Sequence, residues 1–456
     1  MPGNRPRALH AADASAAGAS TAHAAAAGAP LADLLAAGAS VVGNPPVDRS
    51  PAVARLLLLA VIASAVAACG AADRAAEGVV VRDSAGVRIV ENSAPAWGPD
   101  DAWRIPDAPV VRIGAVEGAA HEQFFRIAGV LRLDDGRIVV ADDGARELRF
   151  YDAAGRFLFA VGRDGAGPGE FRSIRRMGLR ADSIWAYDAG LQRVSLFTTD
   201  GRYVRSFALP APNDAPIPAP IGWFGDGSLL AVAIRPFWHG EPATGVQPIL
   251  ARYLRLSATG EVLGAIGEFF DGEHFVEAEE DGGISSIALP FARNAVVAVD
   301  DAGFYFGTSD AFEILRYAPD GRLERRIRRA HRNAPVTEED LTAFIRERQR
   351  YVSGENARRS MEAMFRRLPL PSEMPAYADL RLDAEGNLWV EEYRTPGAEQ
   401  ARWAVFDADG RWLGVVALPP RFTPLRIGAD FVLGREVDEL DVQYVTLYRI
   451  EKPGAH

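Results

Sequence analysis

Acidic side chains with the potential for chemistry recur at the ends of short apolar segments. Asp142, Asp188, Asp310 and Glu391 each stand at or near such an end. Carboxylates gathered around one axis could ligate a hard cation such as Ca²⁺. Aspartate in this position also caps turns by accepting hydrogen bonds from backbone amides, and that structural role is the favoured interpretation.

Arginines follow the acidic residues a few positions later. Arg146, Arg193 and Arg316 lie on or just before the next predicted strand. A ring of guanidinium groups could hold carboxylates or phosphates through paired hydrogen bonds. The alternative, which the sequence favours, is a set of structural ion pairs with Asp142 and Asp188.

A denser group of carboxylates occupies a predicted loop over Glu268–Asp281. Glu268, Asp271 and Glu273 are weak candidates for a metal site, because Ca²⁺ prefers carboxylate oxygens. The segment lacks the alternating acidic spacing of a calcium-binding loop, so a solvated acidic loop is favoured. The seven histidines show no HxxxH spacing, and a single cysteine excludes internal disulfides. No cofactor is therefore predicted, with Ca²⁺ as the only candidate.

The single cysteine, Cys69, lies where an export signal would end. Arg49 and Arg55 precede the apolar run Leu56–Ala67, which is too short for a membrane-spanning helix of roughly 20 residues. A short basic region followed by such a run is typical of a secretory signal. The segment Val66–Cys69 resembles a bacterial lipobox, in which the cysteine thiol takes a diacylglycerol. A buried cysteine at the end of an apolar helix is the alternative.

The resemblance implies cleavage before Cys69. Gly70 follows, and the absence of Asp there favours the outer membrane or cell surface over the inner membrane. Residues 1–50 are rich in Ala and Gly and are expected to be disordered. Translation beginning near Val47 or Val53 would omit most of them.

The composition restricts the class of protein and the kind of ligand that the chain can bind. The chain has 48% hydrophobic and 24% charged residues, which is typical of a globular protein. Its net charge of −11 disfavours nucleic-acid binding, which needs a clustered basic surface.

A four-strand unit recurs from about residue 80 onward. The clearest copy spans Gln123–Gly162, with tight turns at Asp135-Gly136 and Ala154-Gly155. Glycine supplies the positive φ that such hairpins require. A period of about 45 residues is that of a propeller blade. The predicted second strands are Arg137–Asp142, Ser183–Asp188, Ser228–Ala233, Gly303–Gly307, Asn387–Glu391 and Asp430–Gly434.

These copies predict an all-β fold, a six-bladed β-propeller with a helical insertion between blades. The last copy has about three strands, so Val87–Val90 or Trp103–Ile113 is expected to complete it. Seven blades would require residues 87–113 to form most of a blade. The predicted organisation is an extension plus lipoprotein signal over 1–68, a tether over 69–82, and a propeller over 83–452 with helices at about 336–368.

Long insertions all fall on one end of this predicted propeller. They join second to third strands or one blade to the next, and an insertion-rich end of a repeat protein is commonly its binding face. The insertions are Pro236–Pro248, Glu268–Leu289, Arg329–Tyr377 and Arg394–Gln400.

Two segments resemble the NHL repeat: Arg137–Gly155 and Gly162–Phe171 (GRDGAGPGEF). Over residues 84–450 the chain resembles six-bladed propeller lipoproteins of environmental bacteria, on the segments Asp83–Val87, Val90–Asn92 and Gly386–Val390. That resemblance implies the fold and an anchor in the cell envelope.

Two functions follow as hypotheses. The first is a non-catalytic binding scaffold at the cell envelope that recognises a protein, peptide or glycan. The alternative is a metal-dependent hydrolase or lyase, similar to the propeller lactonases, with a site in the axial channel. Three or four unpaired carboxylates or imidazoles converging on the axis would favour the enzyme.

Overall fold

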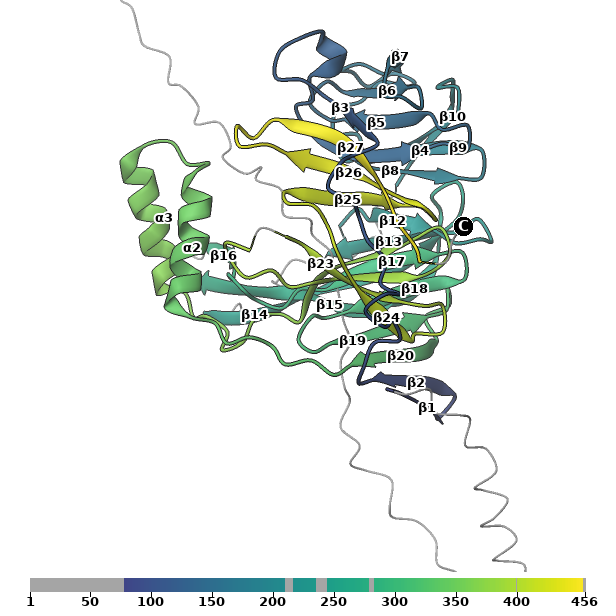
Figure 1. Cartoon of the computed structure of the whole chain (residues 1–456). Helices are drawn as coiled ribbons and strands as arrows, with labels where there is room; N and C mark the ends of the chain where they lie inside the picture. The colour runs from purple at the N-terminus through teal and green to yellow at the C-terminus, as the bar shows by residue number, and fades with distance from the viewer. Residues whose placement is uncertain (1–77, 210–215, 235–243, 279–282, 399, 454–456) are drawn as a thin grey trace, which may run out of the picture.

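The chain folds into a ring of six antiparallel sheets (Figure 1). The structure is a computed structural model that describes residues 78–209, 216–234, 244–278, 283–398 and 400–453. In four of the six sheets the strands follow one another along the chain, and the other two also take in strands from the N-terminal part of the described chain. The first strands of most neighbouring blades contact each other around the axis. The all-β prediction and the prediction of six blades are confirmed, and the alternative of seven is wrong.

Blades 1 and 2 are regular four-stranded units. Each second strand begins after a tight turn and is almost entirely buried. Blade 1 comprises β4 (Ile127–Arg132), β5 (Ile138–Asp142), β6 (Glu147–Tyr151) and β7 (Phe157–Val161). Blade 2 comprises β8 (Ile174–Arg180), β9 (Ser183–Asp188), β10 (Arg193–Thr198) and β11 (Tyr203–Ala208).

Blades 3 and 4 carry additional strands. In blade 3, β14 and β15 continue beyond the blade as a long hairpin to which β16 adds. Blade 3 comprises β12 (Ala219–Trp223), β13 (Leu229–Ile234), β14 (Gly245–Leu256), β15 (Val262–Ala278) and β16 (Ile284–Ala288). Blade 4 comprises β17 (Val296–Asp300), β18 (Gly303–Gly307), β19 (Glu313–Tyr317) and β20 (Leu323–Arg329).

Blade 5 is again a regular unit, and blade 6 combines both ends of the ordered chain. The outermost strand of blade 6 is β3, which pairs antiparallel with β27 through Val111↔Leu447 and Ile113↔Val445. Blade 5 comprises β21 (Tyr377–Leu382), β22 (Leu388–Glu392), β23 (Arg402–Phe406) and β24 (Trp412–Ala417). Blade 6 comprises β25 (Phe422–Ile427), β26 (Phe431–Val437), β27 (Gln443–Arg449) and β3 (Val111–Ile113).

The closing strand therefore comes from the second of the two predicted segments. A short 3₁₀ turn, η1 (Ala120–Glu122), leads from it into blade 1. The turn glycine Gly155 (φ +83°) approaches β3 so closely that a Cβ would lie 2.8 Å from Val111. This turn of blade 1 thus packs directly on the strand that closes the ring.

The other segment, around Val87–Val90, has a different position. Strands β1 (Val79–Ser84) and β2 (Val87–Asn92) form a hairpin, and β2 pairs in parallel with β20 at the outer edge of blade 4. Asn92 fixes the hairpin, because its side-chain amide donates to the carbonyls of Arg328 and Gly410 and its oxygen accepts from the amide of Trp412. Blade 4 is covered at its edge rather than exposed to pairing with other chains.

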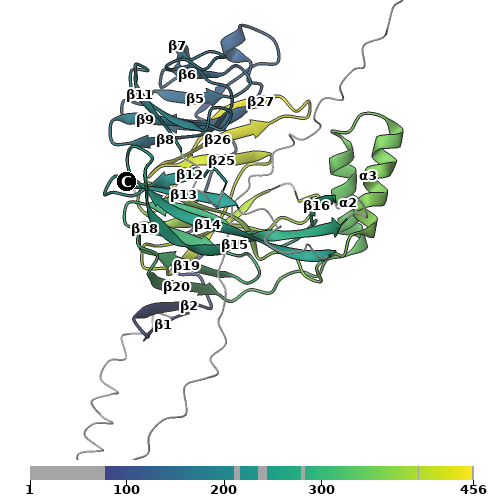
Figure 2. The same ribbon diagram turned by 180° about the vertical axis from the view of Figure 1, so that it is seen from behind.

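Two helices leave the ring between blades 4 and 5 and lie beside the tip of the β14–β15 hairpin (Figures 1 and 2). The helices are α2 (Glu338–Gln349) and α3 (Glu355–Arg367). Thr337 and Asp340 form the predicted capping box, and Leu341 and Ile345 are the buried side chains of α2. No helix within the described residues is both long and apolar enough to cross a membrane.

Candidate functional site

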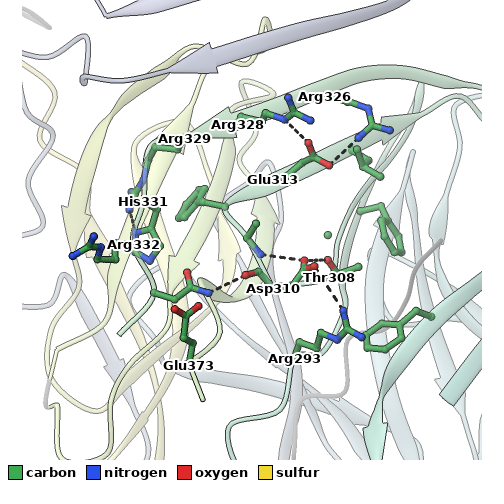
Figure 3. Close-up of a pocket in the computed structure, with 17 residues that line it drawn as sticks. Arg293, Thr308, Asp310, Glu313, Arg326, Arg328, Arg329, His331, Arg332 and Glu373 are labelled. Atoms are coloured by element: carbon green, nitrogen blue, oxygen red, sulfur yellow. Dashed lines mark hydrogen bonds and ion pairs between the residues drawn. The ribbon is translucent and has the colours of Figure 1, made fainter. Parts of the chain in front are cut away.

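A pocket of about 920 Å³ opens at the end of the propeller that carries the long insertions. It is formed by the loop between β18 and β19, the end of β20 and the segment that follows it (Figure 3). Guanidinium and carboxyl groups dominate its polar lining, namely those of Arg293, Asp310, Glu313, Arg326, Arg328, Arg329, Arg332 and Glu373. Thr308, His331 and Asn333 are the other polar residues of the lining.

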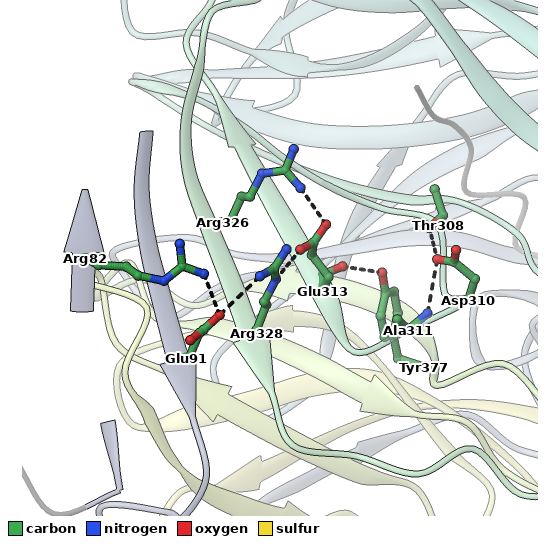
Figure 4. Close-up of polar contacts among 9 residues, drawn as sticks. All are labelled: Arg82, Glu91, Thr308, Asp310, Ala311, Glu313, Arg326, Arg328 and Tyr377. Atoms are coloured by element: carbon green, nitrogen blue, oxygen red, sulfur yellow. Dashed lines mark hydrogen bonds and ion pairs between the residues drawn. The ribbon is translucent and has the colours of Figure 1, made fainter. Parts of the chain in front are cut away.

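Glu313 organises one wall of this pocket. Its carboxylate accepts from Arg326 at 2.9 Å and from Arg328, while Arg328 also reaches Glu91 of the N-terminal hairpin at 3.1 Å. Glu91 is shared in turn with Arg82 at 2.9 Å (Figure 4). This chain of ion pairs holds both arginines in fixed positions and joins the hairpin to the pocket wall.

Arg329 forms the deepest cationic group, with a side chain only 6% exposed. It pairs with Glu392 of blade 5 at 2.7 Å, and its guanidinium lies 4.0 Å from the ring centroid of Phe312. Burial and the charge of Arg329 lower the pKa of His331, which disfavours the charged imidazolium. The positive charge of the pocket therefore comes from its arginines.

The pair Arg329–Glu392 leads to a pH-dependence prediction. Burial alone would raise the pKa of Glu392, but the hydrogen bonds and charges of Arg329 and Arg402 lower it overall. A carboxyl group whose pKa is lower in the folded chain stabilises the fold at pH values above its pKa in the unfolded chain. That contribution is lost as the pH falls through its pKa in the folded chain. Glu392→Gln is expected to lower the free energy of unfolding at pH 7 by about 1.5–3 kcal/mol.

Denaturant melts at a series of pH values measure this effect. As the pH falls below the pKa that Glu392 has in the unfolded chain, the Gln variant should lose less stability than the parent chain. Glu324→Gln is the matched control, since Glu324 pairs with the exposed Arg322 on β20, the strand that also carries Arg329. A Glu392→Gln variant with the parent's acid profile would contradict the assignment.

The pocket mouth combines an unpaired arginine with groups that are held in place. Arg332 is exposed and has no ion pair with any residue that the structure describes. Glu373 is also exposed, and the amide of Asn333 donates to the backbone carbonyl of Asp310. Arg293 is held between Glu273 at 2.8 Å and Asp310 at 3.7 Å. The mouth thus presents one free cation beside groups held in place.

Two of the carboxylates singled out in the sequence lie inside the blades. Asp142 and Asp188 have no exposed surface. Asp142 accepts from the amides of Arg126 and Gly144 at 3.1 and 3.0 Å, and Asp188 accepts from three backbone amides. Both carboxylates tie the second strand to the segment that enters its own blade, so neither faces the axis as an open ligand.

The arginines have partners other than the predicted ones. Arg146 pairs with Asp143 at 2.7 Å rather than with Asp142, and Asp143 also accepts from the amide of Ile174 in blade 2. Arg193 donates to the carbonyls of Ala166, Gly167 and Glu170, and Arg316 pairs with Asp300 at 3.0 Å. The expected pairing with Asp142 and Asp188 is wrong, because Asp142 lies beside Arg149 at 3.3 Å instead and Asp188 accepts from backbone amides.

Glu391 and Asp310 lie apart from each other. Glu391 is buried on β22, where burial raises its pKa, and it pairs with Arg394 at 3.0 Å. Asp310 lies on the loop after β18 and belongs to the pocket described above. Of the candidate residues, only Asp310 lines this pocket.

The acidic segment predicted as a loop is largely a strand. Glu268, Asp271 and Glu273 all lie on β15, whose pairing with β14 continues to Val276. Glu268 pairs with Arg252 at 3.2 Å and Glu273 with Arg293. The register with β14 shifts at Asp271, which has no backbone partner there, and the described residues contain no group of three metal-ligating side chains suited to an ion. Cys69, Glu279, Glu280 and Asp281 lie outside the described residues.

Most residues that line the pocket were not predicted as site residues from the sequence. Its signal is the basic run Arg325–Arg332, which includes five arginines and a histidine on and after a predicted fourth strand. Such a run is ordinarily a solvated strand face. The partners that turn it into a pocket come from distant positions, such as Glu91 and Glu392.

Comparisons with known proteins agree with this architecture. A family model described as a 6-bladed beta-propeller, DUF5128, matches residues 122–218, which include blades 1 and 2. No curated protein matches the sequence.

Solved structures that resemble the chain share little sequence with it. A putative exported protein from Bacteroides fragilis is 11% identical with a TM-score of 0.45, covering 80% of this chain and 100% of its own. A DUF4221 member from Bacteroides vulgatus is 11% identical with a TM-score of 0.49, covering 77% and 99%. Virginiamycin B lyase from Staphylococcus aureus is 12% identical with a TM-score of 0.36, covering 76% and 99%. The strand order of the six sheets, together with the family match over two of them, identifies the chain as a six-bladed β-propeller.

Proposed function

We propose that this chain is an exported, lipid-anchored binding scaffold that recognises an envelope protein, peptide or glycan at its insertion-rich end. The observation that carries the proposal is the pocket beside blade 4, where paired arginines and carboxylates surround the free guanidinium of Arg332. Side chains held in place before binding lose little conformational freedom when a ligand arrives, which favours affinity.

The N-terminal hairpin relates this pocket to the proposed anchor. Eight residues separate Cys69 from Gly78, where β1 is about to begin. A chain of that length spans at most about 30 Å, at 3.3–3.6 Å per residue. Glu91 of the same hairpin contacts the pocket residue Arg328 (Figure 4). Lipidation of Cys69 would therefore keep the pocket close to a membrane surface, where envelope components are concentrated.

Charge reversal at the pocket mouth tests the recognition site. Arg332→Glu is expected to weaken binding of the full chain to its envelope ligand at least tenfold, because the free cation becomes an anion. Arrays of bacterial envelope glycans and peptides would identify ligands, and titration of each hit would measure affinity. Arg322→Glu is the matched control, since Arg322 lies in the exposed turn at the opposite end of the same blade. Equal loss of affinity in both variants, or in neither, would argue against the pocket.

Expression of the full chain in a bacterial host tests the anchor. The parent chain should incorporate a radiolabelled fatty acid and fractionate with membranes, and Cys69→Ser should abolish both. An unlabelled parent chain would remove the lipid anchor from the proposal while leaving the pocket unaffected.

A further inference from the structure

His331 presents a hydrogen-bond donor to the pocket beside blade 4. Its side chain is exposed and lines the cavity, and its Nδ1 lies 3.2 Å from Nη2 of Arg329 (Figure 3). A guanidinium group can only donate, so Nδ1 must be the acceptor and the proton of the neutral ring is on Nε2. Within the described chain no protein group accepts from that Nε2. The ring therefore offers an N–H to a ligand in the pocket.

The surroundings of His331 favour this neutral form. Burial and the positive charge of Arg329 lower the pKa of His331, and the charge of Glu392 opposes them. Arg329 is itself held by its pair with Glu392 at 2.7 Å and by the ring of Phe312, 4.0 Å from its guanidinium. A proton on Nδ1 would turn a second donor toward that fixed cation. The Nε2 donor is thus in place before a ligand binds.

Other residues of the pocket mouth add a second donor and two acceptors. The guanidinium of Arg332 has no ion pair with a described residue. The amide nitrogen of Asn333 donates to the backbone carbonyl of Asp310 at 2.8 Å, so its Oδ1 remains as an acceptor. Glu373, which also lines the pocket, contributes an exposed carboxylate. A ligand that satisfies this mixture must both accept and donate hydrogen bonds.

The aromatic rings of the pocket are covered. Phe270, Phe306 and Phe312 are 8%, 0% and 4% exposed. The guanidinium of Arg293 lies 4.6 Å from the ring centroid of Phe270, and Arg329 covers Phe312 in the same way. Peptide and protein partners commonly bury aromatic side chains at the centre of an interface, and these three rings are closed to such contacts. A polar, hydroxyl-rich ligand matches the pocket better.

We propose that the pocket beside blade 4 binds a sugar acid, namely the uronic acid of an anionic glycan. Arg332 binds the carboxylate through paired hydrogen bonds, and Nε2 of His331 donates to a second oxygen of the sugar. Sugar hydroxyl groups both donate and accept, so they suit the acceptors of Asn333 and Glu373. This inference rests on the proposed function, since it names the ligand class of the same pocket.

Titration calorimetry of the full chain tests the ligand class with tri-galacturonate, galactotriose and tri-glutamate at matched ionic strength. Tri-galacturonate should bind in one equivalent. The other two should bind about tenfold more weakly or less, because galactotriose lacks the carboxylates and tri-glutamate the hydroxyl groups. Arg332→Gln should weaken the binding of tri-galacturonate about tenfold. Arg322→Gln, in the exposed turn at the opposite end of the blade, is the matched control and should leave it unchanged.

Two substitutions of His331 distinguish a ligand contact from a support for Arg329. His331→Gln can place an amide N–H near the position of Nε2, whereas His331→Asn can replace only the acceptor at Nδ1. The Asn variant should lose about tenfold in affinity for tri-galacturonate, and the Gln variant should lose less. Both should melt near the temperature of the parent chain, because the side chain at this position is exposed. A larger loss in the Gln variant would overturn the contact from Nε2.

The remaining outcomes separate this inference from the proposed function. Equally tight binding of tri-glutamate would identify an acidic peptide instead, and equally tight binding of galactotriose would remove the role of the carboxylate; either overturns the sugar acid. Absence of binding by tri-galacturonate would also overturn it, while an array ligand that depends on Arg332 would still support the scaffold. Tri-galacturonate binding that Arg332→Gln leaves unchanged would put the sugar acid outside this pocket and contradict the inference.

Discussion

Replacing Ile113 with aspartate is expected to lower the free energy of unfolding by more than about 4 kcal/mol, because it places an unpaired charge in a packed core. Ile113 is 4% exposed on β3 and packs among apolar residues of blades 1 and 6. Because β3 is the strand that closes the ring, its loss would also expose the edge of β27 to pairing with other chains.

Denaturant melts and size-exclusion chromatography would measure this effect as reduced stability and as oligomers. Val110→Asp is the matched control, since Val110 directly precedes the strand and is 63% exposed. Its expected cost is below about 0.5 kcal/mol. A small cost at Ile113 would mean that the ring stays closed without β3.

Asp142→Ala is expected to cost about 3–5 kcal/mol, the range for breaking a buried ion pair by removing one partner. The Oδ2 of Asp142 lies 3.3 Å from Nη1 of Arg149, whose side chain is almost completely buried. The substitution removes the more deeply buried of the two carboxylates beside that guanidinium, the other being Glu147 at 3.0 Å, and also removes the acceptor for the amides of Arg126 and Gly144. Asp142→Asn should cost less, because an amide oxygen still accepts from those backbone groups.

This substitution separates a structural role from a binding role for Asp142. Thermal and denaturant melts should show the loss, while ligand affinity per folded molecule should stay unchanged. Asp200→Ala provides the control, because Asp200 is 83% exposed in a turn of blade 2. Reduced affinity with unchanged stability would instead return Asp142 to the functional site.

The number of blades could be predicted from the sequence because the information is local. Turns such as Asp135-Gly136 and Ala154-Gly155 specify hairpins over a few residues, and the alternation of apolar residues follows from strand geometry. The helical insertion was predictable for the same reason, since Thr337 and Asp340 cap α2 through contacts three residues apart.

Contacts between distant segments were decided only by the tertiary structure. Val87–Val90 and Trp103–Ile113 have similar strand patterns, and the sequence could not show which one closes the ring, because the choice depends on packing against blade 1. Asp142 and Asp143 are adjacent and chemically identical, yet Arg149 pairs with the first and Arg146 with the second. The sequence by itself determined the repeat, its turns and its six blades, since these depend on neighbouring residues. The pocket depends on side chains that only the closed ring brings together, as Arg329 and Glu392 show across 63 positions of sequence.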